Sequence, residues 1–314
     1  MGASIATNNC EHGLIMKVIY FQDPEGNFGD ELNRWLWPRL FDGAVTGFGH
    51  HGIETLEENG KESLLFYGIG TILDDRIPVE PKKIIFGSGF GYGAPLFNLN
   101  NCDIRFVRGP KTAEAIGVPI DKALTDPAIL LRHFFPVVAN ENKVHDVSFM
   151  PHHSTTKGDF WEDACKDSGI NYISPMGFDV EAVVQQISSS RLVIAEAMHA
   201  AIVADAFRVP WIPVTSVPET NPFKWQDWCE SLDLRYQPHT ITPIYRNVTG
   251  NPAKDLINKV KALLRRHELR AISKKRGATM LSDTRVLDAR RMKMDELVEG
   301  LRDHLRIDSA KPPC

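Results

Sequence analysis

The residues best suited to chemistry follow an apolar run, in the segment Ile194-Ala195-Glu196-Ala197-Met198-His199-Ala200-Ala201. The run predicts a buried strand, and the alanines predict a helix that packs closely on a sheet. A helix N-terminus presents backbone N–H groups that bind phosphate, and histidine changes its proton state near neutral pH. Glu196, Met198 and His199 are therefore candidates for an anion site, with His199 also a candidate acid; the alternative is a structural histidine.

A second polar group, Asn27-Phe28-Gly29-Asp30, follows the first predicted strand. Gly29 lets a ligand approach the backbone. Asp30 stands where a helix begins, and a role as its N-cap would alone account for an aspartate there. The functional alternative makes Asn27 and Asp30 hydrogen-bond acceptors for sugar hydroxyls, or makes Asp30 a base.

Basic residues follow another predicted strand, with Arg108 directly after it and Lys111 a short step later. A guanidinium matches a carboxylate or a phosphate with two parallel hydrogen bonds. The two residues are therefore either a clamp for an anion or a solvated basic pair on the surface.

His152 and His153 follow the first strand of the second half of the chain. Adjacent side chains point in different directions, so at most one of the two rings need face a ligand. Two histidines that share a metal ion are more naturally placed at i and i+4 of a helix, or in alternation along a strand. We therefore expect no metal site here, and one histidine as a hydrogen-bonding group or acid.

Two glycine groups, Gly68-Ile69-Gly70-Thr71 and Gly87-Ser88-Gly89-Phe90-Gly91, also follow predicted strands. Neither has the GxGxxG spacing of dinucleotide-binding folds, and neither has an acidic residue at the usual distance. The sequence thus argues against a nicotinamide-dependent enzyme.

The candidate residues lie after strands in a chain where strands and helices alternate. Apolar runs predict strands over residues 16–21, 63–67, 83–86, 103–107, 145–150, 171–173, 191–195 and 209–214. Helical spacing predicts helices over residues 30–41, 111–116, 160–168, 179–188 and 199–207. This alternation predicts an α/β fold with parallel sheets, whose ligands bind at the carboxyl ends of the strands.

A stretch containing proline and asparagine, residues 135–144, separates two α/β sets of similar size. We predict a disordered extension over residues 1–15, Rossmann-like domains over residues 16–140 and 141–245, and a helical tail over residues 246–314. Two such domains suggest a GT-B-like arrangement, in which two Rossmann-like halves face each other across a cleft.

Composition limits the setting in which such a protein works. With a net charge of -4 over 314 residues, the chain as a whole is not expected to bind nucleic acid. The five cysteines are widely spaced, which argues against disulfides and zinc sites. Neither a secretory signal nor a run of ~20 apolar residues is evident. We expect a cytoplasmic protein and leave open a peripheral contact with the inner face of the plasma membrane.

Residues 253–276 predict a basic amphipathic helix, with nine basic residues against two acidic ones. Its apolar stripe consists of Leu256, Val260, Leu263 and Leu264. One interpretation packs this helix back on the first domain, and the other docks it on anionic lipid. A further helical segment is predicted over residues 292–306.

Taken together, the segments at the strand ends resemble the polysaccharide pyruvyl transferase family. The matching segments are Asn27-Phe28-Gly29-Asp30, Gly68-Ile69-Gly70-Thr71, Gly87-Ser88-Gly89, Val107-Arg108-Gly109, Thr125-Asp126-Pro127, Pro151-His152-His153 and Ala197-Met198-His199-Ala200-Ala201. The chain looks most like the ketal pyruvate transferases of exopolysaccharides such as succinoglycan and xanthan. The resemblance implies a GT-B-like fold, phosphoenolpyruvate as donor and a sugar, often lipid-linked, as acceptor.

The resemblance also assigns residues. It places Arg108 and His199 at the donor, but many members have Arg-Leu-His where this chain has Ala197-Met198-His199, so a donor-binding arginine is missing. Ketal formation needs an acid, a cationic pocket and a base, and we expect His199 as the acid and Asp30 as the base. The expected donor-binding residues are Arg108, Lys111, Glu196 and Met198. The expected acceptor-binding residues are Asn27, Gly29, His152 and His153. Phosphoenolpyruvate is a co-substrate in this scheme, and no cofactor is expected.

Two other functions stay open. A GT-B glycosyltransferase that uses a nucleotide sugar would share the cleft and the phosphate site, with Glu219 as a carboxylate for the ribose. A non-catalytic glycan-binding protein is the other, and the change at Ala197 suggests it.

Overall fold

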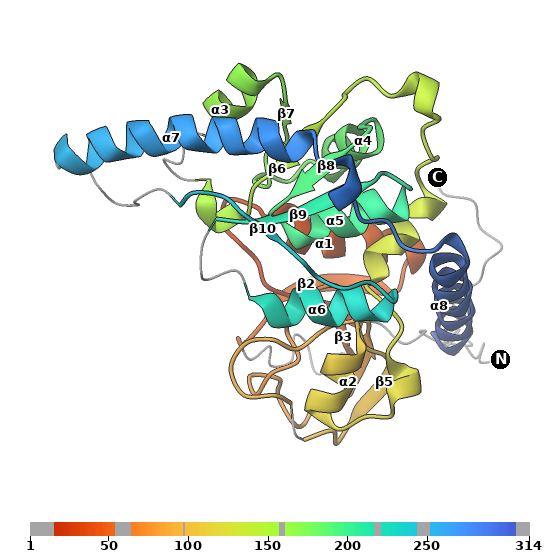
Figure 1. The fold of residues 1–314 in the computed structure, drawn as a ribbon. Coiled ribbons are helices and arrows are strands. Elements are labelled where there is room, and N and C mark those ends of the chain that lie inside the picture. The colour runs from red at the N-terminus through yellow and green to blue at the C-terminus, as the bar shows by residue number, and fades with distance from the viewer. Residues whose placement is uncertain are drawn as a thin grey trace, which may run out of the picture.

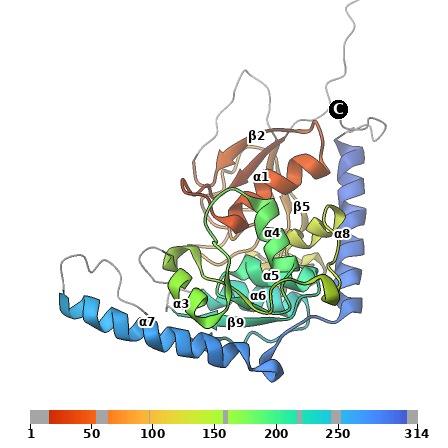
Figure 2. The same cartoon turned by 90° about the horizontal axis from the view of Figure 1, so that it is seen from above.

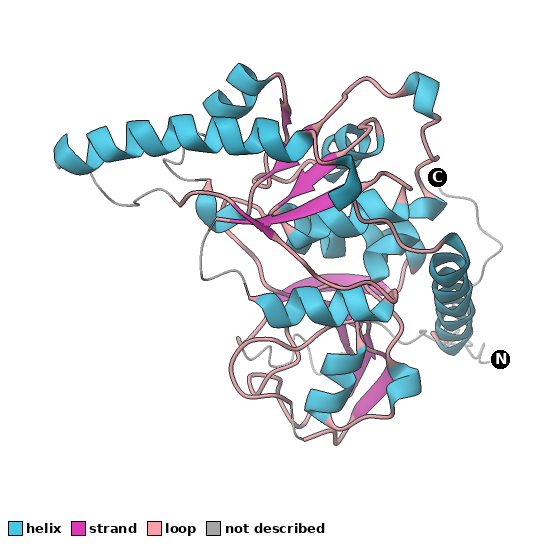
Figure 3. Cartoon of the chain, in the orientation of Figure 1, coloured by secondary structure: helices cyan, strands magenta, loops and turns pink. Residues whose placement is uncertain are grey.

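A computed structural model describes residues 16–53, 64–96, 98–156, 161–216, 221–243 and 252–305. Within these ranges the chain forms two five-stranded sheets, and every pair of neighbouring strands is parallel (Figure 1, Figure 3). Parallel strands need crossover connections, and helices supply most of them here. The predicted α/β fold with two parallel sheets is confirmed.

The first sheet has the strand order β2-β1-β3-β4-β5. Its strands are β1 (Met16–Tyr20), β2 (Val45–His50), β3 (Leu64–Tyr67), β4 (Lys83–Phe86) and β5 (Cys102–Phe106). Strands β3 and β4 are buried along their whole length, which agrees with their nearly continuous apolar sequences LLFY and KIIF.

Helix α1 (Phe28–Leu40) follows β1 and is fixed beside the end of β3. It buries Leu32, Leu36 and Leu40 along one stripe. Asn33 Nδ2 donates to the Ile69 carbonyl and Asn33 Oδ1 accepts from the Ile69 N–H, both at 2.9 Å. The first turn of α1 therefore lies next to the loop that follows β3.

The second sheet has the strand order β10-β9-β8-β6-β7. Its strands are β6 (Ser148–Met150), β7 (Asn171–Tyr172), β8 (Val193–Ala195), β9 (Trp211–Thr215) and β10 (His239–Thr240). The connecting helices are α3 (Trp161–Ser168), α4 (Val180–Ser188) and α5 (Met198–Ala206). Eight of the nine residues of α5 are buried, as expected for a helix that is apolar on nearly every side.

Two later helices connect the second sheet to the first part of the chain. Helix α6 (Pro222–Ser231) packs against α2 (Pro110–Ile116), and Arg302 of α8 (Thr284–His304) donates to the Leu40 carbonyl at 2.8 Å. One buried apolar cluster contains both Phe66 of the first sheet and Val193 of the second. The two sheets thus share a packed core.

Several elements differ from their predictions. The sequence did not predict β2, β10 or α6, and α8 begins at Thr284 rather than at residue 292. Strand β2 lies at the edge of its sheet, contains two glycines and is mostly half-exposed, so its sequence lacks a clear apolar pattern. The expected helical tail is present as α7 (Pro252–Ser273) and α8. The predicted boundary near residue 140 stays a prediction, and residues 1–15 lie outside the described ranges.

In the part of the chain that the structure describes, no helix combines the length and the apolar character that crossing a bilayer requires.

Candidate active site

A cavity of about 400 Å³ lies at the carboxyl ends of strands from both sheets. Its walls include residues that follow β1, β3, β6 and β8: Asn27, Gly29, Asp30, Gly70, Thr71, His152, His153, Met198 and His199. Ligands of open α/β sheets bind at such strand ends. The cavity is therefore the candidate active site, and most of the residues expected at a site do meet in it.

The first turn of α1 brings a carboxylate to this cavity. Asn27 is the N-cap of α1, with its side-chain oxygen 3.4 Å from the Gly29 N–H, and its Nδ2 donates to Asp30 Oδ2 at 2.7 Å. Asp30 is therefore not the N-cap, contrary to the simpler of the two sequence interpretations. Desolvation raises the pKa of Asp30 to about 6, although His199 and the Asn27 hydrogen bond act in the opposite direction. This carboxyl group can exchange a proton near neutral pH.

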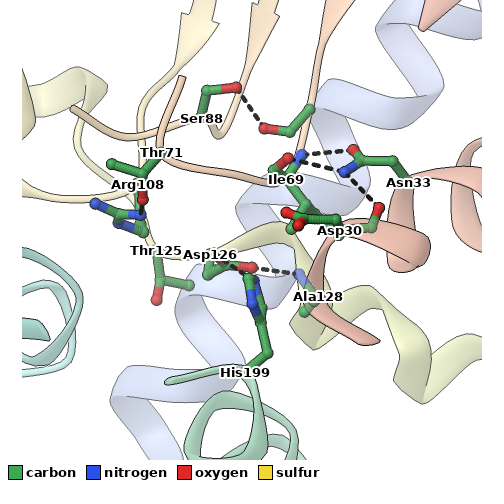
Figure 4. A network of polar contacts seen from close by, with 12 residues as sticks. Asp30, Asn33, Ile69, Thr71, Ser88, Arg108, Thr125, Asp126, Ala128 and His199 are labelled. Carbon is green, nitrogen blue, oxygen red and sulfur yellow. Dashed lines mark hydrogen bonds and ion pairs between the residues drawn. The ribbon is translucent and has the colours of Figure 1, made fainter. Parts of the chain in front are cut away.

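His199, in the first turn of α5, points toward Asp126 (Figure 4). His199 Nε2 lies 3.6 Å from Asp126 Oδ2, and among the described residues neither atom has a hydrogen-bond partner. Asp126 Oδ1 accepts from the Ala128 N–H at 3.0 Å and so caps the 3₁₀ helix Pro127–His133. Asp126 is completely buried and held by this cap, so it is placed to orient the imidazole.

No role was predicted for Asp126 from the sequence. Its segment Thr125-Asp126-Pro127 contributed to the family resemblance, but an aspartate before a proline is also common as the cap of a helix. Asp126 does act as such a cap through one oxygen, and only the packing of α5 shows that its other oxygen faces His199.

Gly29 makes the close approach of α1 to His199 possible. A Cβ atom at position 29 would overlap the Nδ1 and Cε1 atoms of the His199 ring. The Nδ1 edge of the ring thus faces the start of α1, whereas Nε2 faces Asp126. The sequence linked Gly29 to the approach of a ligand, and in the structure its nearest neighbour is this catalytic candidate.

The structure corrects the expectation that Arg108 contacts an anion directly. Arg108 is fully buried, and its Nε donates to Asp227 Oδ2 of α6 at 3.0 Å. Its two other nitrogens donate to Thr71 Oγ1 at 2.9 Å and to the Phe90 carbonyl at 3.2 Å. The guanidinium does not line the cavity, but Thr71, which lies beside Arg108 in Figure 4, does. Arg108 therefore supports the cavity wall and joins α6 to the first sheet.

Two other expected donor-binding residues also lie away from the cavity. Lys111 pairs with Glu230 of α6 at 3.5 Å on the surface. Glu196 is fully buried, where it accepts from the His152 N–H at 2.9 Å and from the Ser216 N–H at 2.9 Å. Glu196 thus ties together the loops after β6, β8 and β9. Its carboxylate oxygens are satisfied by fixed donors rather than by a ligand. Met198 does line the cavity.

Both histidines after β6 line the cavity, although the sequence required only one to do so. Their ring centroids are 4.2 Å apart. Burial, and then the charge of Lys224, lower the pKa of His153 below its ordinary value. His153 is therefore better suited to hydrogen bonding in its neutral form than to carrying a charge.

Among the residues that the structure describes, the cations that line the cavity are two that the sequence did not single out, Arg76 and Lys224. Arg76 is held by Asp74 through two hydrogen bonds of 2.9 and 2.7 Å. Lys224 comes from α6, and its Nζ lies 3.4 Å from the hydroxyl of Tyr92. No periodic or motif signal marked either residue, because Arg76 lies in a loop and α6 itself was not predicted.

A buried histidine, His51, lies beside Asp74 at the same cavity. His51 is 2% exposed, and its Nε2 lies 3.1 Å from both oxygens of Asp74. Burial opposes ionisation of Asp74, but hydrogen bonds from His51 and Arg76 outweigh it and lower the pKa of that carboxyl. His51 Nδ1 is buried and has no hydrogen-bond partner among the described residues.

Within the described ranges, no three His, Cys, Asp or Glu side chains gather as they would around a metal ion. Glu219, which a nucleotide-sugar enzyme would use for the ribose, lies outside the described residues.

Comparisons with known proteins agree with the sequence resemblance. A family model described as "Polysaccharide pyruvyl transferase" matches residues 27–216. Over 229 residues the chain is 38% identical to the succinoglycan biosynthesis protein ExoV of Rhizobium meliloti (strain 1021), covering 72% of this chain and 68% of that protein.

Two solved structures are distantly similar. A functionally uncharacterized protein of Klebsiella pneumoniae subsp. pneumoniae NTUH-K2044 is 17% identical with a TM-score of 0.40, over 73% of this chain and 93% of that one. An alpha-glucosyltransferase in complex with UDP and DNA is 10% identical with a TM-score of 0.36, over 94% of this chain and 100% of that one.

Proposed function

The chain belongs to the polysaccharide pyruvyl transferase family, and we propose that it transfers the enolpyruvyl group of phosphoenolpyruvate to a sugar of an exopolysaccharide precursor. The product is a pyruvate ketal, and the proposed acceptor is lipid-linked. The observation that carries the proposal is the meeting of Asp30, His199 and Asp126 beside a cavity that also holds two cations.

The donor carries a carboxylate and a phosphate and so needs positive groups. Arg76 and Lys224 are the proposed partners of these anions, in place of Arg108 and of the arginine missing at Ala197. Arg76 is already oriented by Asp74, and half of its side chain is exposed, so it can bind an anion without leaving its partner. Backbone N–H groups at the start of α5 can add hydrogen bonds to the phosphate.

The reaction can proceed in two steps that balance atoms and charge. One sugar hydroxyl adds to C2 of phosphoenolpyruvate as its proton passes to Asp30, and His199 gives a proton to the methylene carbon, which becomes a methyl group. The second hydroxyl then displaces phosphate from the same carbon, and its proton leaves with the phosphate. Asp30 returns its proton to His199, and Asp126 holds the ring in place. No group is oxidised or reduced.

We also infer a GT-B-like arrangement of two Rossmann-like halves, built on residues 16–140 and 141–245. The position of the cavity at the carboxyl ends of both parallel sheets supports it. The acceptor would then enter between the halves and contact Asn27, Gly29, His152, His153 and His51.

Acceptor-dependent release of inorganic phosphate from phosphoenolpyruvate tests the proposal. Before an acceptor is known, thermal unfolding with phosphoenolpyruvate, UDP-sugars and GDP-sugars separates the alternatives, because a ligand that binds only the native state raises Tm. We expect phosphoenolpyruvate to raise Tm and the nucleotide sugars to leave it unchanged. A rise with a nucleotide sugar alone would indicate a glycosyltransferase, and binding of a glycan without phosphate release would indicate a non-catalytic relative.

A further inference from the structure

Helix α7 is attached to the rest of the protein along one face. Arg265 is 1% exposed, stacks over the Trp161 ring at 3.7 Å, and donates from Nε to the Thr242 carbonyl at 2.7 Å. Leu269 and Ile272 are buried in the apolar cluster that contains Trp161 of α3. This attachment is to the second half of the chain, and α3 is the main partner of α7.

The opposite face of α7 carries a row of large apolar side chains in solvent. These are between 44% and 66% exposed: Leu256, Ile257, Val260, Leu263 and Leu264. At about 3.6 residues per turn, they lie on the side of the helix away from Arg265, Leu269 and Ile272. Figure 2 shows that the first half of α7 extends beyond the remainder of the protein. The interpretation that α7 packs back on the first domain is therefore wrong, because α7 packs on α3 and its predicted apolar stripe is exposed.

Basic residues border this apolar face on both sides. Lys259 and Arg270 lie along one edge, where Arg270 also donates to the Asp167 carbonyl of α3. Lys261 lies along the other edge, and Lys254, five turns before Ile272, lies beside the attached face. The acidic residue Glu268 faces the protein, where its two oxygens accept from the N–H and hydroxyl of Thr242 at 2.8 and 2.6 Å. The solvent face is thus apolar in the centre and positive at its margins.

We propose that this face of α7 lies on the surface of a lipid bilayer that contains anionic lipid. The apolar row enters the boundary between headgroups and acyl chains, and the basic margins meet headgroup phosphates. A second copy of the chain fits less well, because pairing two such faces would bring basic margins together, whereas paired helices carry opposite charges at their edges. The inference goes beyond the proposed function and does not depend on the cavity.

Flotation of the full chain with vesicles tests the proposal. The vesicles are phosphatidylcholine alone, or phosphatidylcholine in which a third of the lipid is phosphatidylglycerol. We expect binding to the anionic vesicles to be at least tenfold stronger. Each basic residue near an anionic surface contributes about fivefold, so K259E should weaken this binding by more than about fivefold. The polar variant V260Q/L263Q/L264Q should reduce binding to both vesicles to background.

Matched controls make the same changes elsewhere. R285E/K293E reverses two exposed charges on α8, and I120Q/V144Q replaces two exposed apolar side chains, so both should bind vesicles as the unchanged chain does. Circular dichroism checks that each variant is folded.

Equal binding to both kinds of vesicle, no binding to either, or full binding by the polar variant would overturn the proposal. A dimer in sedimentation velocity that V260Q/L263Q/L264Q dissociates, without vesicle binding, would instead assign the face to a second copy.

Discussion

The Nε2 atom of His199 and the Oδ2 atom of Asp126 face each other at 3.6 Å, and within the described ranges neither has another polar partner. Buried polar atoms without partners are costly, so a small shift of the ring that closes this bond is favourable. On the other side of the same ring, Nδ1 faces the start of α1, where Asp30 lies. One imidazole is thus flanked by two carboxylates from different elements.

Asp126→Asn tests whether Asp126 positions His199. The variant keeps an oxygen for the Ala128 N–H but removes the charge beside the ring. We expect kcat to fall by about 10²- to 10⁴-fold, the usual contribution of one positioned acid–base group, with KM for phosphoenolpyruvate nearly unchanged. Steady-state kinetics across pH would measure the fall together with a displaced pH profile. T125S, which keeps a hydroxyl for Ser231, is the control. A kcat within twofold of the unchanged enzyme would exclude the role.

Gly29→Ala should act through the same ring. The added methyl group overlaps His199, so we expect a loss of about 1–3 kcal/mol of unfolding free energy and a lower kcat. In an H199A background the stability cost of G29A should largely disappear, since the clash is gone. Urea unfolding of the four proteins measures this coupling. Gly47→Ala is the control, because its nearest neighbour would lie at an ordinary 3.9 Å. Equal costs of G29A in both backgrounds would contradict the packing described here.

The pKa of Asp30 predicts how stability depends on pH. Its pKa is about 6 in the folded protein against 3.8 ordinarily, so the folded state binds the proton more tightly. The contribution of Asp30 to stability is therefore greatest below about pH 4 and is lost as the pH rises to about 6. Asp30→Asn removes this dependence. Between pH 4 and 7 the free energy of unfolding of the variant should rise relative to that of the unchanged protein, by up to about 3 kcal/mol, as measured by urea unfolding at each pH. A constant difference across that range would show that Asp30 is not desolvated.

One pair of variants distinguishes the cations that line the cavity from those that the sequence predicted at the donor. Lys224→Met removes a cation that lines the cavity, and we expect KM for phosphoenolpyruvate to rise by about 10- to 100-fold, as for a lost hydrogen bond to a charged group. Lys111→Met removes the partner of Glu230 on the surface and should leave KM unchanged. The opposite pattern in initial-rate measurements would restore the donor site expected from the sequence.

Arg108→Met should destabilise the fold rather than weaken the binding of the donor. It leaves Asp227 buried without its cation, which costs about 3–5 kcal/mol when one partner of a buried pair is removed. The double variant R108M/D227L should recover part of this loss. Chemical denaturation provides the measurement. If R108M unfolded normally and only KM for phosphoenolpyruvate rose, Arg108 would have to bind the donor directly.

The sequence predicted the strand-end residues well because parallel strands end at one edge of a sheet. Asp30, His152, His153 and His199 were each expected after a strand, and they line one cavity. Strand β4 was predicted with its observed bounds, since KIIF is short, apolar and buried throughout.

Contacts between distant segments could not be predicted in this way. In the sequence, Arg108 has the features of an anion-binding residue. Its partner Asp227 lies 119 residues away, in a helix that the sequence did not predict. The same helix carries Lys224. Asp126 meets His199 only because α5 packs against the 3₁₀ helix Pro127–His133.

The apolar cluster shared by Phe66 and Val193 has a consequence for turnover. Protein interiors are packed as densely as organic crystals, so a common core resists hinge bending between its two sides. Substrates should therefore enter and products leave through local movements of side chains and short loops, without a clam-like opening of the whole protein. For the same reason, the two halves should unfold together in a single cooperative transition.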